Sequence, residues 1–308
     1  MKKWKQKAIV QKTISFLPFG NKINYLFQKY VTKGVYLNDE YFYDRLSHAT
    51  SHLSAFSKYC EKAAPASSLE IGTGWYPIVP LAFFLSGTDK IYSVDISMLT
   101  NKERLKTTFD RFMDCQKAAK LKDYIKVLPN RWAIFTEIYD QYDKLNFEEI
   151  LKKINLIYLI EDARKLSLPD NSVELINSNN TFEHIYPNIL KPIIKDFIRV
   201  LDKENGIMSH FIDMSDHFAH FDKTINIYNF LQFSDSKWSW IDNSIQPQNR
   251  LRYQDYLNMY QELSLPVTEF SLRAGNLQEL ETVKLDKKYN SFKAEELAIS
   301  HCHLISKF

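Results

Sequence analysis

Apolar residues in this chain form short continuous runs, separated by stretches in which apolar positions recur every three or four residues. The short runs predict buried parallel strands, which are covered on both faces. They span residues 67–71, 90–95, 155–160, 173–176 and 206–213, and two further runs lie at 266–273 and 298–307. The periodic stretches predict helices at residues 39–59, 78–85, 101–120, 187–201 and 253–263. This alternation predicts an α/β protein with a doubly wound sheet.

The turn after the first strand carries the clearest chemistry. Glu70 ends an apolar run, Gly72 and Gly74 follow, and Pro77 suits the first turn of a helix. The second strand closes on Asp95, a position from which a carboxylate can accept hydrogen bonds from ribose hydroxyls. A carboxylate at Glu70 would repel a pyrophosphate and attract an ammonium group. The expected ligand is therefore cationic and carries a ribose, as S-adenosylmethionine does.

On these residues the chain resembles the class I S-adenosylmethionine-dependent methyltransferases, and more narrowly the bacterial methyltransferase-domain type. Glu70, Gly72 and Gly74 match the family's E/D-x-G-x-G motif, although Tyr76 stands where many relatives have a third glycine. The segment 159–176 resembles the third and fourth strand regions. The resemblance implies a mostly parallel seven-stranded sheet with a C-terminal antiparallel hairpin and S-adenosylmethionine as cofactor. The implied cofactor-binding residues are Glu70, Gly72, Gly74, Asp95, Ile96, Asp162, Ala163 and Asn179.

Length and composition suit one large domain with added segments. The 308 residues divide into an N-terminal helical cap at 1–60 and a methyltransferase domain at 61–308, with insertions at about 121–154 and 214–252. A short strand is expected at 123–128 and one or two helices at 131–154. The three cysteines are far apart in the sequence, which indicates a reducing compartment, and no apolar run is long enough to span a bilayer. A cytoplasmic protein is the expectation.

The segment before Asp39 is basic, with eight lysines and no acidic residue, and apolar residues interleave with the lysines. Three interpretations remain open. The segment forms a helical cap over the cofactor site, contacts an anionic membrane surface or a lipid-linked substrate, or contacts nucleic acid. The cap is the preferred interpretation, and nucleic acid is the least favoured.

Two histidines follow strands four and five and are the candidate general bases. Methyl transfer to a hydroxyl requires an aligned nucleophile and benefits from a base, and histidine suits that role near neutral pH. His217 is preferred slightly over His184. The loop after strand five is rich in acids, amides and aromatic residues, so it is expected to bind substrate through Asp213, Asp216, Asn249 and Arg250. Its acids and histidines also suit a divalent ion, but a hydrogen-bonded network is the expectation and no metal site is predicted.

The expected reaction is O-methylation of a glycan or a small polyhydroxylated metabolite. N-methylation of a small molecule and a catalytically silent scaffold are the alternatives. A nicotinamide-dependent oxidoreductase is disfavoured by Glu70 and Pro77, and methylation of nucleic-acid bases is disfavoured because Asn177-Ser178-Asn179-Asn180 replaces an N-P-P-Y type motif. The sequence does not specify the oligomeric state.

Overall fold

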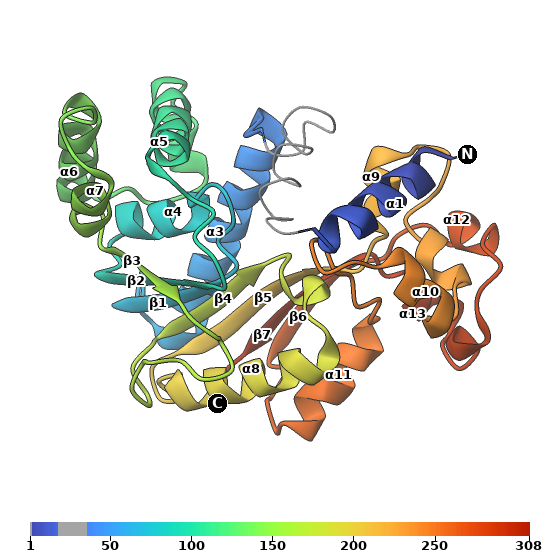
Figure 1. Ribbon diagram of the computed structural model, residues 1–308. Coiled ribbons are helices and arrows are strands. Elements are labelled where there is room, and N and C mark those ends of the chain that lie inside the picture. The colour runs from blue at the N-terminus through green and yellow to red at the C-terminus, as the bar shows by residue number, and fades with distance from the viewer. Residues whose placement is uncertain (1, 18–35) are drawn as a thin grey trace.

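The computed structural model describes residues 2–17 and 36–308, and a seven-stranded sheet forms its centre (Figure 1). The strands lie in the order β3-β2-β1-β4-β5-β7-β6. Strands β1 to β5 are parallel, and β7 is antiparallel to both β5 and β6. Their bounds are β1 Ser67–Ile71, β2 Lys90–Asp95, β3 Leu156–Ile160, β4 Leu175–Asn179, β5 Ile207–Asp213, β6 Glu269–Arg273 and β7 His301–Ser306. The predicted sheet with its antiparallel hairpin is confirmed.

Helices cover both faces of the sheet. One face carries α3 Asp39–Cys60, α4 Ile78–Ser86, α5 Lys102–Lys117, α6 Pro129–Asp140 and α7 Phe147–Lys153, and the other carries α8 Pro187–Val200 and α11 Tyr253–Glu262. Figure 1 shows these two layers above and below the strands. The chain order reverses between β1 and β4, which are neighbours in the sheet. Ligands of open α/β sheets bind at such a reversal, beyond the carboxyl ends of the strands.

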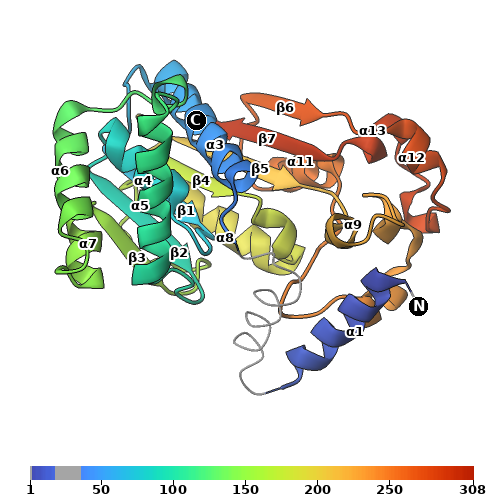
Figure 2. The same ribbon diagram turned by 90° about the horizontal axis from the view of Figure 1, so that it is seen from above.

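A third hydrophobic core lies beside the sheet and joins three separate segments. We call residues 2–17, 214–252 and 274–298 together the side subdomain. It contains α1 Lys3–Ser15, α9 His217–Phe221, α10 Asp235–Ile241, α12 Leu277–Glu281 and α13 Ala294–Ala298. Figures 1 and 2 both show these helices grouped beyond the β6 and β7 end of the molecule. The segment between β6 and β7 was not predicted to contribute helices.

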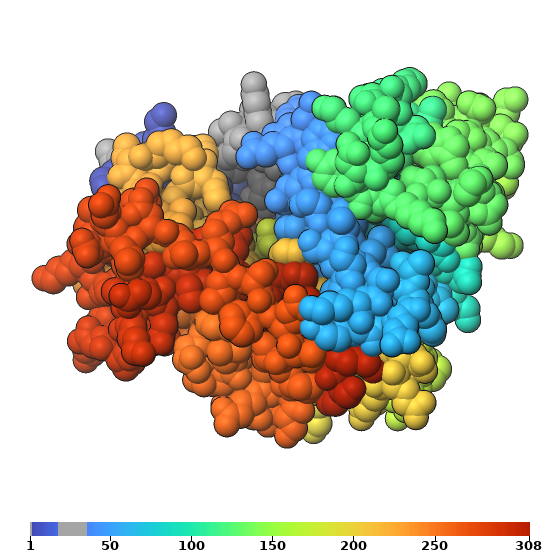
Figure 3. Space-filling view, turned by 180° about the vertical axis from the view of Figure 1, so that it is seen from behind, coloured from blue at the N-terminus to red at the C-terminus, as the bar shows by residue number. Residues whose placement is uncertain are grey.

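The boundary expected at residue 60 is not a boundary between two cores. Phe42, Leu46, Ala49 and Phe56 of α3 are buried in the same cluster as residues of α4, α5 and the sheet. By contrast, α1 packs in the side subdomain through Trp4. The two helices of the predicted cap therefore belong to different parts of the molecule. In the space-filling view, the blue surface of the α3 region lies between the green α5–α7 region and the orange and red C-terminal segments (Figure 3).

The insertion at 121–154 is helical throughout its regular parts. The two predicted helices are present as α6 and α7, but residues 121–123 form a 3-10 turn and 124–128 have no strand partner. The strand expected at 123–128 was therefore wrong, because its apolar residue Ile125 packs among helices in the core. Among the described residues, no helix is both long and apolar enough to cross a membrane.

Candidate functional site

The glycine turn after β1 combines a tight backbone with an open surface. Gly72 and Gly74 have φ angles of 74° and 72°, in the left-handed region that favours glycine. A Cβ at Gly72 would lie 2.6 Å from the side chain of Thr181, so packing excludes any larger residue there. A Cβ at Gly74 would meet only the Gly72 carbonyl oxygen, at 4.0 Å. The main chain at Gly74 is therefore accessible to a ligand.

Glu70 lies beneath this turn with only 4% of its surface exposed. Its Oε1 accepts a hydrogen bond from Asn179 Nδ2 at 2.7 Å, and its Oε2 accepts one from Thr73 Oγ1 at 2.6 Å. Burial raises the pKa of Glu70 to about 7, although both hydrogen bonds and the charge of Arg45 act in the opposite direction. A cation bound beside Glu70 would favour its ionised form.

The carboxyl ends of β2 and β3 provide a second set of ligand-facing groups. Asp95 Oδ1 accepts a hydrogen bond from the Ile96 N–H at 2.7 Å, and burial raises the pKa of the Asp95 carboxyl. The Ile96 side chain is 85% exposed, which leaves an apolar surface next to that carboxylate. Asp162 is half-exposed and binds the Arg164 guanidinium through both oxygens. The Ala163 side chain is buried in the core, so only its main chain can face a ligand.

A chain of hydrogen bonds leads from Glu70 across the face of the sheet that α3 covers. Asn179 Oδ1 lies 3.1 Å from His52 Nε2, His52 Nδ1 lies 2.7 Å from Ser209 Oγ, and Ser209 Oγ lies 2.8 Å from His303 Nε2. Because Asn179 donates its amide N–H to Glu70, its carbonyl must accept from His52. The consistent assignment is that His303 donates to Ser209, Ser209 donates to His52, and His52 donates to Asn179.

The imidazoles in this network are neutral. Burial lowers the pKa of His52 well below its usual value and that of His303 to about 4. His48 also reaches Asn179 Oδ1, at 3.0 Å, and burial, reinforced by the Arg45 charge, lowers its pKa to about 3. Its ring stacks on Phe211 with centroids 3.7 Å apart. Sequence reasoning missed these residues; the only signal was the four-residue spacing of His48 and His52 on a predicted helix.

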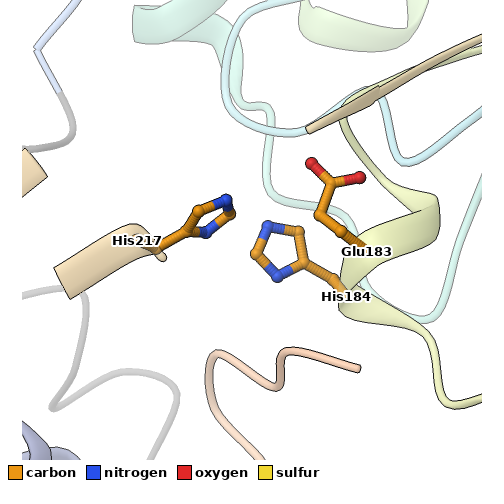
Figure 4. Close-up of side chains that lie close together, drawn as sticks. All are labelled: Glu183, His184 and His217. Carbon is orange, nitrogen blue, oxygen red and sulfur yellow. The ribbon is translucent and has the colours of Figure 1, made fainter. Parts of the chain in front are cut away.

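Acids and histidines gather where β4, β5 and β7 meet at the sheet edge. We call Glu183, His184, Asp213, His217, His220 and His301 the acid–histidine cluster. The two predicted bases are brought together, since the ring centroids of His184 and His217 are 4.8 Å apart. Figure 4 shows the Glu183 carboxylate and the His217 ring on either side of the His184 ring. Asp213 lies 3.3 Å from His217 Nε2, 3.8 Å from His220 Nε2 and 3.4 Å from His301 Nε2.

Two members of the cluster have unusual surroundings. Glu183 is 2% exposed, and no side chain among the described residues donates to either of its carboxylate oxygens. Burial raises the pKa of Glu183 well above its usual value, and the neighbouring charge of Asp213 raises it further. His184 Nδ1 lies 2.7 Å from the carbonyl oxygen of Pro247, so Nδ1 carries the proton. Burial and then His217 lower the pKa of His184 to about 4, which leaves Nε2 as a free lone pair.

Three predicted substrate-binding residues use their polar groups to hold the backbone. Asp216 is fully buried at the start of α9, where it accepts hydrogen bonds from the Phe218 N–H and Asn229 Nδ2. Asn249 Nδ2 donates to two carbonyls of the turn after β4, both at 2.8 Å. Arg250 is 3% exposed and donates to two backbone carbonyls and to Asp235. Of the four predicted residues, only Asp213 faces the cluster.

A cavity of about 360 Å³ lies beside the turn that carries Glu183 and His184. Its lining residues include Lys12 from α1, Tyr186, Trp238, Asp242 and Gln248. Trp238, Asp242 and Gln248 also line a smaller cavity that reaches His217. Most of the lining residues are polar, Tyr186 and Trp238 are aromatic, and the smaller cavity reaches the acid–histidine cluster at His217.

No family model and no curated protein matches the chain. Solved structures of similar fold include a SAM-dependent methyltransferase of Aquifex aeolicus, at 12% identity over 85% of this chain and 90% of that one, with a TM-score of 0.40. A geranyl diphosphate C-methyltransferase of Streptomyces coelicolor matches at 12% identity over 84% and 78%, with a TM-score of 0.43. The [4+2]-cyclase SpnF matches at 10% identity over 83% and 79%, with a TM-score of 0.42. Similarity this distant carries no conclusion about activity.

The chain's own topology nevertheless agrees with the family that its motifs resemble. The seven-stranded sheet, the antiparallel β7 and the glycine turn between β1 and α4 are the features that the resemblance to class I methyltransferases implies. The fold is Rossmann-like, with the glycine turn and the acid–histidine cluster on the same edge of the sheet.

Proposed function

We propose that this protein is an S-adenosylmethionine-dependent methyltransferase that methylates a hydroxyl of a glycan or a small polyhydroxylated metabolite. One observation carries the proposal. A buried carboxylate with a raised pKa, Glu70, lies beneath the accessible main chain at Gly74, and Asp95 with the exposed Ile96 follows along the same edge. An ammonium group, a ribose and an adenine ring need these three environments in this order.

The residues present fit the cofactor. The two oxygens of Glu70 each accept one hydrogen bond from a neutral donor and keep further lone pairs for an ammonium group. Asp95 Oδ1 is held by its own loop, which orients Oδ2 for ribose hydroxyls. Ile96 offers an exposed apolar surface for adenine. A dinucleotide would place its pyrophosphate near the Glu70 carboxylate, which opposes the oxidoreductase alternative.

The cofactor, when bound, supplies an electrophilic methyl group whose carbon–sulfur bond breaks with its electron pair leaving on sulfur. The protein must align the acceptor oxygen with that carbon and take the hydroxyl proton. His217 is the preferred base, because the Asp213 carboxylate lies 3.3 Å from its Nε2 and can orient the ring. His184 is a weaker base, because its pKa lies at about 4.

The acceptor class is inferred from the cavity beside the cluster. Carboxylate and amide groups pair with hydroxyls, and the indole of Trp238 provides a flat apolar surface of the kind on which sugars stack. The cavity volume of about 360 Å³ suits a small metabolite or one terminal sugar of a glycan.

The test is titration of the purified protein with S-adenosylhomocysteine by calorimetry, with NAD as the competing ligand. Micromolar binding of S-adenosylhomocysteine that Glu70→Gln weakens, with no binding of NAD, supports the proposal. A folded protein that does not bind S-adenosylhomocysteine contradicts it. Binding without methyl transfer to any hydroxyl or amine acceptor would identify a silent scaffold.

Contact of the N-terminus with anionic membranes remains a proposal, as does a cytoplasmic location. The buried side of α1 packs in the side subdomain through Trp4 and Ala8, so a membrane would meet the exposed Ile9, Phe16 and Leu17 instead. Lys22, Lys29 and Lys33 lie outside the described residues. Co-sedimentation with anionic and neutral vesicles, compared between wild type and Phe16→Ser, tests this contact.

A further inference from the structure

We propose that the acid–histidine cluster binds a divalent transition-metal ion, with Glu183, His184 and His217 as its ligands and Asp213 beside them. The atoms that these three residues can offer to a metal all lie within 4.8 Å of one another. Asp213, His217 and His220 form a second group within the same limit, so His217 connects the two groups. The proposed ion lies at the carboxyl ends of β4 and β5.

Glu183 provides the strongest evidence for a ligand. A buried carboxylate normally receives hydrogen bonds, because removing an unpaired charge from water is costly. No side chain among the described residues donates to either oxygen of Glu183, and only the backbone N–H groups of Glu183 and Asp213 act on it. The carboxylate lies beside the His184 and His217 rings (Figure 4). The charge of Arg45 favours the ionised form of Glu183, and the charge of Asp213 opposes it. A bound cation would satisfy both carboxylates at once.

His184 is oriented as a metal ligand. Metal-binding histidines commonly donate the second ring N–H to a carbonyl or carboxylate, which fixes the tautomer and the ring. His184 donates Nδ1–H to the Pro247 carbonyl, and this leaves Nε2 facing the cluster with a lone pair. Asn249 supports the same turn through the carbonyls of Phe182 and Ile185. Pro247 and Asn249, both in the segment after β5, therefore fix the turn that carries Glu183 and His184.

His217 completes the set from a different element. It begins α9, whose start is fixed by the buried Asp216 side chain. His217 Nε2 is buried and has no hydrogen-bond partner among the described residues, although Asp213 Oδ2 lies 3.3 Å away. Ligands of a bound ion lie about 2.0–2.2 Å from it and hence about 3–3.6 Å from one another. The ligand atoms now lie within 4.8 Å of one another. Side-chain rotations that move these atoms by about 1–2 Å would bring them to the spacing of a bound ion's ligands.

The ligand types select the class of metal. Imidazole favours Zn²⁺, Fe²⁺, Co²⁺ and Ni²⁺, whereas Mg²⁺ and Ca²⁺ prefer sites made of oxygen atoms alone. Two imidazoles with one or two carboxylates therefore favour a first-row transition metal over Mg²⁺. His220, whose side chain is 59% exposed, borders the cluster on its solvent side, where an additional oxygen ligand can enter.

The ion would also define the acceptor, and this step rests on the proposed function. A hydroxyl bound to a divalent ion loses its proton more readily, so the ion would replace a histidine as the activating group. An acceptor with two neighbouring oxygen atoms, such as a vicinal diol or a hydroxy acid, would bind such an ion best. In that case His184 and His217 act as ligands, and the released proton passes to solvent.

Metal binding is tested on chelator-treated protein, by calorimetry with Zn²⁺ and by the visible absorption of Co²⁺. We expect one tight site per chain, Co²⁺ bands typical of nitrogen and oxygen ligands, and Mg²⁺ binding at least a hundredfold weaker. Glu183→Gln keeps the side-chain size and removes the anionic ligand, so it should weaken Zn²⁺ binding at least tenfold. Glu70→Gln is the matched control: it also neutralises a buried glutamate, but it should weaken S-adenosylhomocysteine binding and leave Zn²⁺ binding intact.

The two proposals fail in different ways. Absence of Zn²⁺ and Co²⁺ binding by the folded wild type overturns the metal site, whatever the result with S-adenosylhomocysteine. Unchanged Zn²⁺ affinity in Glu183→Gln, or Mg²⁺ binding as tight as Zn²⁺ binding, overturns the assigned ligands. If Glu183→Gln does not fold, His184→Gln with the Co²⁺ spectrum replaces it, and an unaltered spectrum again contradicts the proposal. Zn²⁺ binding without S-adenosylhomocysteine binding keeps the site and rejects the methyltransferase.

Discussion

The affinity for S-adenosylhomocysteine should depend on pH through Glu70. Burial raises the pKa of this carboxyl to about 7, and an ammonium group requires the ionised form. At pH 7 about half of the carboxyls are ionised, and at pH 6 about one tenth are. Affinity should therefore rise about tenfold, or about 1.4 kcal/mol, between pH 6 and pH 8.

The groups around Glu70 leave it as the titrating residue in this range. Arg45 stays charged, because the carboxylates and Tyr41 nearby outweigh the effect of its burial and raise its pKa. His48 and His52 stay neutral, because burial lowers the pKa of His48 to about 3 and that of His52 well below its usual value. Asp95 acts on Glu70 with the same sign of charge, which is one reason for the raised pKa of Glu70.

Calorimetry in two buffers with different ionisation enthalpies measures the proton released. We expect about half a proton released per ligand at pH 7. Glu70→Gln should bind more weakly and lose both the proton release and the rise in affinity from pH 6 to pH 7.5. The reasoning is refuted if wild-type affinity is constant over this range, or if the variant keeps the same pH profile.

Three further predictions concern neighbouring residues. Gly74→Ala should lower the free energy of unfolding by only about 1–2 kcal/mol but abolish S-adenosylhomocysteine binding. Gly72→Ala should lower the free energy of unfolding by about 1–3 kcal/mol more, because its Cβ would overlap the Thr181 side chain. Asp95→Ala should weaken calorimetric affinity about ten- to a hundredfold, since it removes charged hydrogen bonds to ribose; an unaltered affinity would show that this carboxylate does not face the ligand. His52→Leu should lower thermal stability and cofactor affinity together, while His210→Leu, a buried histidine on the other face of the sheet, should lower stability alone.

The fold could be predicted well because its signals are local. Buried parallel strands are apolar runs bounded by turn residues, and the seven strands of the sheet all lie within a few residues of the expected positions. The placement of the residues at the carboxyl ends of β1, β2 and β4 could also be predicted, because the carboxyl ends of parallel strands lie at one edge of the sheet. The side subdomain could not be predicted, because its core joins segments more than 200 residues apart, such as Trp4 and Asp222.

Three of the four predicted substrate-binding residues hold the backbone instead of facing the acid–histidine cluster. Asn249, Arg250 and Asp216 were expected to meet substrate because they are polar and follow β5. The long segment after β5 has little regular structure, so many of its backbone groups need side-chain partners, and these residues supply them. Polarity in a sequence does not distinguish a residue that binds a ligand from one that satisfies a buried carbonyl. Arg252 shows the same point, since it is fully buried and donates to three carbonyls.

The polar face of α3 connects the N-terminal region to the cofactor site. Asn179 donates to Glu70 and accepts from His52, so the position of α3 and the surroundings of Glu70 depend on one amide group. If α3 moved away, water would reach Glu70, its pKa would fall toward the usual value, and Asn179 would lose the partner that orients it. A carboxylate in water attracts an ammonium group weakly, whereas the buried one attracts it strongly. Tight cofactor binding therefore requires α3 to be docked on the sheet, although α3 contributes no residue to the glycine turn.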